Sequence, residues 1–163
     1  MLAVDLEPDP DGPGPAEGSP SAGSPGGGQT GTTDLPQNDI SQDGSVVFFT
    51  SPTGATNPDR RLYRRENGVT LHVAAEENAG QDVPEGPAEF RGATPDGSKV
   101  LFTSDQQLVD ADTNESSDLY VYAHSADPAT DLNLRVLSSP GAPDPNVQGV
   151  LGYSDTGARV YFV

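Results

Sequence analysis

The sequence contains no cysteine, so neither a disulfide framework nor a thiolate metal site can hold the protein together. The lack of cysteine also leaves the redox compartment of the protein open. Stability must therefore come from packed side chains and hydrogen bonds.

Basic residues are scarce: eight Lys and Arg stand against 25 Asp and Glu, which gives a formal net charge of −17. A charge of this sign repels phosphate backbones and anionic lipids, so we expect no binding to nucleic acid or to a membrane surface. Cations and basic partners are compatible with it. Half of the basic residues lie in "RRLYRR" at 60–65, where we expect mostly weak, exposed ion pairs with carboxylates.

Long apolar runs are also missing. No stretch approaches the roughly 18 apolar residues of a membrane-spanning helix, so we expect no membrane insertion. The first 25 residues lack the basic start and apolar run of a secretory signal. If the protein is exported, we expect the signal to lie outside this chain.

Residues 1–36 are dominated by Pro, Gly, Ser, Asp and Glu, without a single Lys or Arg. Such a segment buries too little apolar surface to offset the entropy lost on ordering. The composition predicts a disordered acidic tail or linker, which places the core within residues 37–163.

A short phrase occurs three times in that region. It reads "SQDGSVVFFTSP" at 41–52, "TPDGSKVLFTSD" at 94–105 and, more weakly, "SDTGARVYFV" at 154–163. The Asp-Gly pair predicts a turn, because Gly accepts a positive φ, and the β-branched and aromatic residues that follow predict a strand. In the first copy Val46 and Phe48 alternate with Val47 and Phe49, so both faces of the strand are apolar and both should be covered.

Further extended segments surround each copy. A weaker one precedes each turn ("NDIS", "AEFRGAT", "VLGYS"), and two follow the first two copies, at 60–66 and 69–75 and at 118–124 and 132–139. No helical period is present. The sequence therefore predicts an all-β protein in which each full repeat forms four short antiparallel strands.

These repeats resemble the WD40-like β-propeller repeats of the TolB type, and "TPDGSKVLFTSD" is the most specific part of the match. The chain departs from the pattern at Gln42, where Pro is preferred, and at Thr156, which replaces Asp. The resemblance implies two four-stranded blades, at about 37–76 and 88–139, and the start of a third at 147–163. Because closed propellers have four to eight blades, we expect a fragment of a longer protein that can self-associate through open blade edges.

The loop "DADTNESSD" at 110–118 carries the strongest chemical signal. Oxygen-bearing side chains occupy alternate positions, as in a calcium loop: Asp110, Asp112, Asn114, Ser116 and Asp118. The loop lacks the central Gly and the final Glu of that motif. The alternative interpretation is a loop whose side chains cap their own backbone.

No motif supports catalysis; "GYSDTG" at 152–157 does not match Gly-x-Ser-x-Gly. We expect a non-catalytic interaction or ligand-binding module that contacts a protein or a polysaccharide. The resemblance favours an exported bacterial protein that is extracellular, at the cell surface or periplasmic. Two alternatives remain: the accessory propeller of a hydrolase such as a serine peptidase, and a calcium-stabilised extracellular repeat protein.

Overall fold

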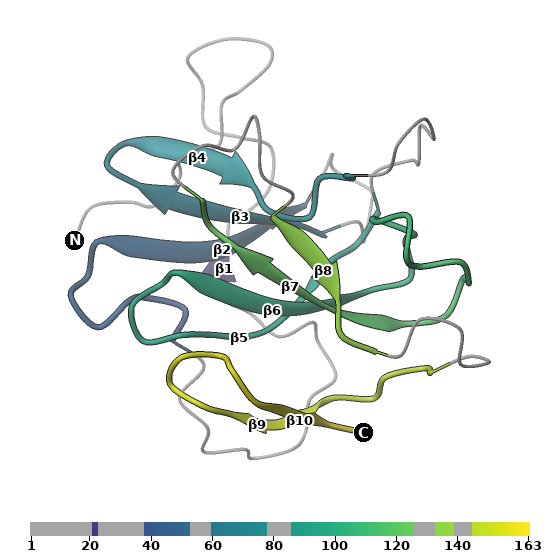
Figure 1. Cartoon of the computed structure of the whole chain (residues 1–163). Coiled ribbons are helices and arrows are strands. Elements are labelled where there is room, and N and C mark those ends of the chain that lie inside the picture. The colour runs from purple at the N-terminus through teal and green to yellow at the C-terminus, as the bar shows by residue number, and fades with distance from the viewer. Residues whose placement is uncertain (1–20, 23–37, 53–59, 78–85, 126–132, 139–144) are drawn as a thin grey trace, which may run out of the picture.

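The computed structural model describes residues 21–22, 38–52, 60–77, 86–125, 133–138 and 145–163 (Figure 1). Within these ranges every regular element is a β-strand, no helix is present, and all strand pairs are antiparallel. The prediction of an all-β protein is confirmed.

The strands form three sheets. The first has the order β1-β2-β3-β4, with β1 at Ser21–Ala22, β2 at Val46–Pro52, β3 at Arg60–Glu66 and β4 at Val69–His72. The second has the order β5-β6-β7-β8, with β5 at Glu89–Ala93, β6 at Lys99–Ser104, β7 at Asp118–Ala123 and β8 at Leu134–Val136. The third is the hairpin of β9 at Val150–Tyr153 and β10 at Val160–Phe162. We call residues 38–77, 86–138 and 145–163 the first, second and third units.

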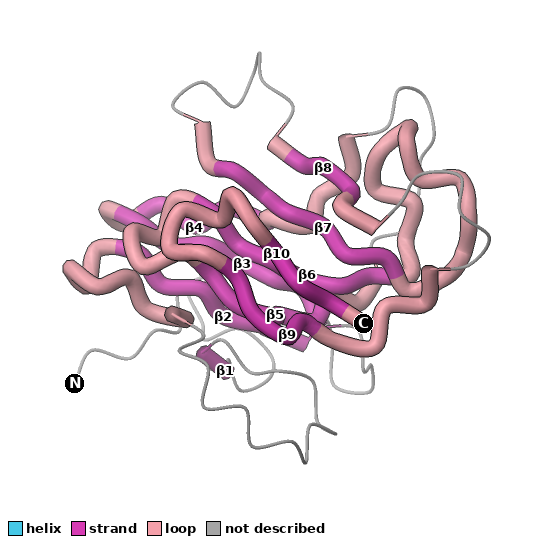
Figure 2. Tube along the Cα trace, turned by 60° about the horizontal axis from the view of Figure 1, so that its bottom comes forward, coloured by secondary structure: helices cyan, strands magenta, loops and turns pink. Residues whose placement is uncertain are grey.

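The three copies of the repeated phrase lie in three separate sheets, because β2, β6 and β10 each belong to a different one. The sheets follow one another down the view of Figure 1, and the turned view of Figure 2 places the β9–β10 hairpin over β5 and β6. The glycine before each strand has a positive φ: 74° at Gly44, 68° at Gly97 and 64° at Gly157. Turn and strand thus form as the sequence predicts in all three units.

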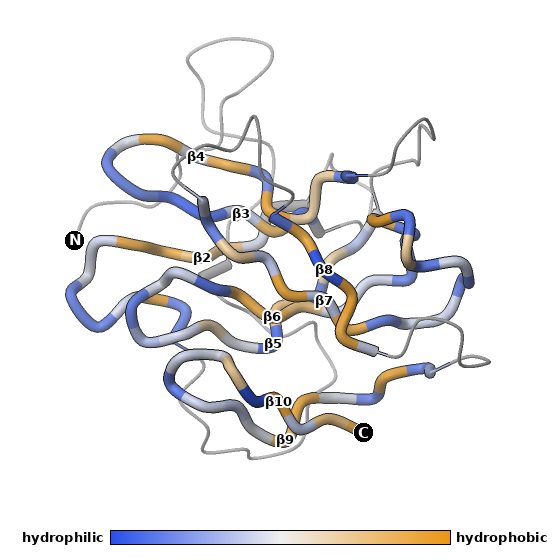
Figure 3. The backbone as a smooth tube through the Cα atoms, in the orientation of Figure 1, coloured by the Kyte–Doolittle hydropathy of each residue, from blue (hydrophilic) through white to orange (hydrophobic). Residues whose placement is uncertain are grey.

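The second sheet is buried on both faces. Val100 and Phe102 of β6 belong to a core shared with Val46 and Phe48 of the first unit. Leu101, which points to the opposite face, belongs to a second core that includes residues of the third unit. Figure 3 shows the apolar residues along these strands. Each large side chain removed from water in this way stabilises the fold by about 1.5–3 kcal/mol, and the expectation of a strand covered on both faces is met in β6.

The edge of the first sheet differs from expectation. Residues 38–41, expected as its first strand, contribute only an isolated bridge between Ile40 and Val47. The neighbouring position along β2 is taken by β1, whose Ser21 pairs with Thr50. These two residues belong to the stretch 1–36 for which we predicted disorder; the rest of that stretch lies outside the described residues.

The expectation of exposed ion pairs in "RRLYRR" is wrong for Arg64, which is buried. Its guanidinium pairs with Glu66 at 3.0 Å and donates a hydrogen bond from Nε to the Gly97 carbonyl, 3.4 Å away in the second unit. The neighbouring sheet covers the arginine and supplies an acceptor, which sequence spacing alone does not show.

Candidate binding sites

The repeated turns are held by the same hydrogen bonds in the first two units. The Ser41 hydroxyl donates to Asp43 Oδ1 at 2.7 Å and accepts from the Val46 amide at 2.9 Å. In the second unit, the Thr94 hydroxyl donates to Asp96 Oδ1 at 2.6 Å and accepts from the Lys99 amide at 3.0 Å. The side chain before each turn therefore ties the aspartate to the start of the following strand.

Each of these aspartates accepts further hydrogen bonds from the serine two residues later. The Ser45 amide and hydroxyl donate to Asp43 Oδ1 at 3.0 and 2.8 Å, and Ser98 does the same to Asp96. Hydrogen bonds to the ionised form favour it. They lower the pKa of Asp43 from 3.8 to about 2, with the Ser41 hydroxyl as the largest cause, and they lower the pKa of Asp96 through Thr94 and Ser98.

The third turn keeps the backbone part of this arrangement without the aspartate. The Gly157 amide donates to the Ser154 carbonyl at 2.7 Å, and the Ser154 hydroxyl accepts from the Arg159 amide at 3.1 Å. Thr156 stands at the position of Asp43 and Asp96, so Asp155 is not used to hold this turn.

Two of the turn glycines also pack closely on the preceding unit. A Cβ added to Gly97 would lie 2.7 Å from Val46 Cβ, and one added to Gly157 would lie 3.1 Å from Lys99 Cδ. Val46 and Lys99 occupy the same position, two residues after the glycine of their own turns. Gly44, which no described unit precedes, has nothing within 4 Å. The contact between the first and second units is therefore repeated, in register, between the second and third.

Hydrogen bonds reinforce both contacts. The Gln42 amide donates to the Pro95 carbonyl at 2.7 Å, joining the turns of the first and second units. Lys99 Nζ donates to the Thr156 carbonyl at 2.7 Å, joining the second unit to the third turn. The turns consequently gather at one end of the stack.

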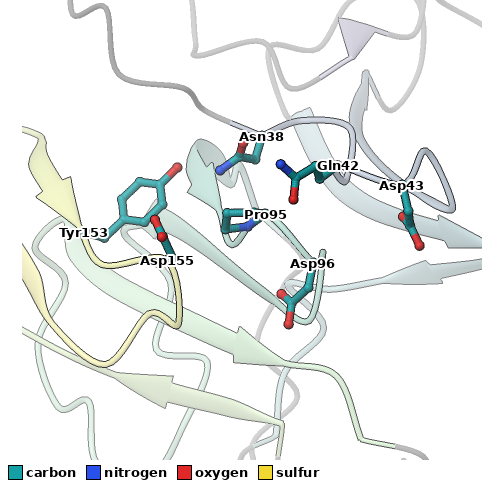
Figure 4. Close-up of a pocket in the computed structure, with 7 residues that line it drawn as sticks. All are labelled: Asn38, Gln42, Asp43, Pro95, Asp96, Tyr153 and Asp155. Carbon is teal, nitrogen blue, oxygen red and sulfur yellow. The ribbon is translucent and has the colours of Figure 1, made fainter.

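A cavity of about 840 Å³ opens among these turns. Figure 4 shows Tyr153 and Asp155 of the third unit on one side, with Pro95 and Asp96 between them and the residues of the first unit. The complete lining comprises Asn38, Gln42, Asp43, Pro95, Asp96, Tyr153 and Asp155. Three carboxylates, two amides and a phenol can accept and donate hydrogen bonds here, and their net charge favours a cationic ligand group.

Tyr153 forms the wall of this cavity against the second unit. A Cβ on Gly92 would meet its hydroxyl at 2.5 Å, so only glycine leaves room for the ring. Burial raises the pKa of Tyr153, partly offset by hydrogen bonds from the Ala93 backbone and the Asn38 side chain. The phenol is therefore a neutral hydrogen-bonding group at ordinary pH.

The sequence-predicted calcium loop follows β6 and leads into β7. Asp112 and Asp118 are buried, Asn114 and Ser116 are half-buried, and Asp110 is exposed. The structure thus turns two of the five predicted ligands inward and leaves Asp110 in solvent.

Much of the loop caps its own backbone, as the alternative interpretation proposed. Asp112 Oδ1 accepts from the Asn114 amide at 3.2 Å, and Asn114 Oδ1 accepts from the Ser116 amide at 2.7 Å. The Tyr120 hydroxyl donates to the other carboxylate oxygen of Asp112. Sequence reasoning missed Tyr120, whose position in the Leu-Tyr strand was read only as strand propensity.

Asp118 is the least satisfied member of the loop. One of its carboxylate oxygens accepts from the Ser138 hydroxyl, whereas Oδ2 is buried without a hydrogen-bond partner among the residues that the structure describes. Burial raises the pKa of Asp118, and the nearby charge of Asp112 raises it further; hydrogen bonds from Ser138 and Asn114 oppose both effects. In the described part of the chain no three His, Cys, Asp or Glu side chains form a metal-binding group. A cation here would need the Asp112 and Asp118 carboxylates together with amide, hydroxyl or water oxygens.

Comparisons with protein-family models, with curated proteins and with solved structures found no match. A search for helices long and apolar enough to cross a membrane found none among the described residues. The function must therefore be argued from the geometry of the chain itself.

Proposed function

We propose that the protein is a non-catalytic binding module built from β-propeller blades of the TolB-like, WD40-like kind, in which the first two units are blades and the third unit begins another. The observation that supports this proposal is the repeated contact of Gly97 on Val46 and of Gly157 on Lys99. Sheets that stack through the same residue positions, unit after unit, are what a propeller requires.

The ligand-contacting surface in this proposal is the cavity among the turns. All three units contribute to it, and it lies where loops are held by a rigid scaffold, as binding residues commonly do. Its Asp43, Asp96 and Asp155 carboxylates favour a protein or polysaccharide that presents amino groups.

Titration calorimetry tests the proposal with a short oligolysine peptide, an amine-bearing chitosan oligosaccharide and an anionic heparin fragment. We expect the two cationic ligands to bind and the heparin fragment not to bind. Binding should weaken with added salt, because the cavity is open to solvent and exposed charges are screened.

The decisive comparison is between Asp155→Asn and Asp110→Asn, since a net charge of −17 attracts any polycation to some degree. Both replacements remove one exposed carboxylate, but only Asp155 lines the cavity. Asp155→Asn should weaken binding several-fold and Asp110→Asn should not. Equal effects would show that net charge alone attracts the ligand and would overturn this assignment of the surface.

Calcium stabilisation is a second candidate, favoured by one observation: the buried, unpartnered Oδ2 of Asp118 beside a second buried carboxylate, Asp112. Two carboxylates that share a buried site are stabilised by a bound cation or by a proton. The two possibilities give opposite responses to a chelator, as argued in the Discussion.

A further inference from the structure

The third unit exposes an edge that is covered in the other two units. In the first and second sheets the strand after the turn lies between two neighbours, with β3 beside β2 and β7 beside β6. In the third, β10 pairs only with β9. The backbone groups on the other edge of β10 have no strand partner within the described part of the chain.

The direction of the free backbone groups follows from the pairs already made. The Arg159 carbonyl accepts from the Ser154 amide, and the Val163 amide and carbonyl bond with Gly149. Because successive residues of an antiparallel strand point their amides and carbonyls to opposite edges, those of Val160 and Phe162 point away from β9. An extended segment can bond to them.

One aromatic contact shows what side chain this segment should carry. Phe49 of β2 lies directly across from Tyr63 of β3, and their rings stack with centroids 5.4 Å apart. Phe102 of β6 lies directly across from Tyr120 of β7, and their rings stack at 5.5 Å. The same phenylalanine and tyrosine therefore meet at the same register in both complete sheets.

Phe162 occupies the equivalent position in β10, five residues after the turn glycine, and has no tyrosine across from it. It is 37% exposed, whereas Phe49 is 1% and Phe102 is 0% exposed. In both complete sheets the tyrosine follows a fully buried leucine, and the dipeptide Leu-Tyr occurs in the sequence only at 62–63 and 119–120. Both copies are already used, so the missing strand must come from outside these 163 residues.

We propose that the free edge of β10 binds an extended segment of another polypeptide that carries Leu-Tyr, with the tyrosine stacked on Phe162 and the backbone bonded to Val160 and Phe162. This proposal deepens the proposed function by naming one kind of protein partner and its place of attachment. Like that function, it rests on the equivalence of the three units.

The probe is a fluorescent peptide with the sequence of residues 117–124, Ser-Asp-Leu-Tyr-Val-Tyr-Ala-His, titrated with the whole chain and followed by anisotropy. We expect saturable binding with a Kd of about 10⁻⁵ to 10⁻⁴ M, because one short strand buries much less than a standard interface. The peptide with Tyr120→Ala, and the protein with Phe162→Ala, should each bind about tenfold more weakly through loss of the stacked pair.

Leu151→Ala is the matched control. Leu151 is also exposed, at 59%, but it lies on β9 and not at the free edge. Absence of saturable binding would overturn the proposal, as would an equal loss in the Leu151→Ala variant or self-association through β10 that the peptide fails to inhibit. Asp155→Asn should leave peptide binding unchanged, so failure at the turn cavity and failure at the β10 edge can be told apart.

Discussion

Gly97 packs so closely on Val46 that a single added methyl group at Gly97 would stand 2.7 Å from Val46 Cβ. Two independent constraints thus require glycine here, since its φ of 68° also disfavours every residue with a side chain. The turn glycine serves both the local turn and the contact between units.

Replacement of glycine separates these two roles. Gly44→Ala carries only the backbone strain, about 1–2 kcal/mol, because nothing lies within 4 Å of the new methyl group. Gly97→Ala adds a clash with Val46 that should cost about 1–3 kcal/mol more. Urea denaturation of the two variants measures the difference. Equal losses would show that the first and second units do not pack as described.

The hydrogen bonds of Asp43 make the fold sensitive to acid. Because the folded-state pKa of Asp43 is lowered from 3.8 to about 2, its contribution to stability is fully present above about pH 4 and is lost as the pH falls towards 2. Carbon-detected NMR titration of the side-chain carboxyl should place the midpoint near 2, and Asp43→Asn should flatten the melting temperature in this range. A midpoint near the ordinary value would contradict the turn geometry.

Asp118 should respond to pH in the opposite sense when no cation is bound. Its raised folded-state pKa favours the protonated form, so stability from this residue grows as the pH falls through that pKa and is lost as the pH rises through it. Asp118→Asn keeps an oxygen that can accept from Ser138 and removes the charge, so the variant should match or exceed the parent in melting temperature at pH 7 without metal. A marked loss of stability would contradict this interpretation.

If the loop instead holds calcium, about 1 mM Ca²⁺ should raise the melting temperature by several degrees relative to excess chelator. Asp112→Ala should abolish this difference, whereas Asp105→Ala, which removes an exposed carboxylate outside the loop, should preserve it. Scanning calorimetry measures both. Identical melting curves with and without chelator would exclude calcium stabilisation.

The Tyr120 hydroxyl should matter far more than other phenols. It bonds to the Gln106 carbonyl at 2.6 Å and to the buried Asp112 carboxylate, which would lose its buried donor in Tyr120→Phe. We expect a loss of about 1–3 kcal/mol in the free energy of unfolding. Tyr161→Phe removes an equivalent hydroxyl from a ring that is 63% exposed and should change little. Similar urea midpoints for the two variants would argue against the buried network.

The parts of this fold that are encoded locally could be predicted from the sequence. The Asp-Gly turns, the strands after them and the two apolar faces of β6 follow from glycine's conformational freedom and from alternating side chains within about ten residues. The burial of Arg64 and the fit of Gly97 on Val46 could not be predicted, because each depends on how one sheet is placed against the next. The same holds for β1, whose pairing with β2 joins residues about 30 positions apart.

In the candidate sites, the sequence identified the loop at 110–118 but not which of its oxygens would be buried. That distinction depends on Tyr120 and Ser138, which reach the loop from β7 and from the end of β8. The turn cavity was not predicted at all. Its residues are spread from Asn38 to Asp155 and meet only because the three turns gather at one end of the stack.

The contact of Gly97 on Val46, repeated by Gly157 on Lys99, gives the molecule a polarity. The side of a unit that meets its predecessor differs from the side that meets its successor, so modules can be joined in one orientation and not reversed. A gene in which the second unit is duplicated in tandem would therefore encode an extra module with both docking sides already matched, whereas an inverted or shuffled order would not.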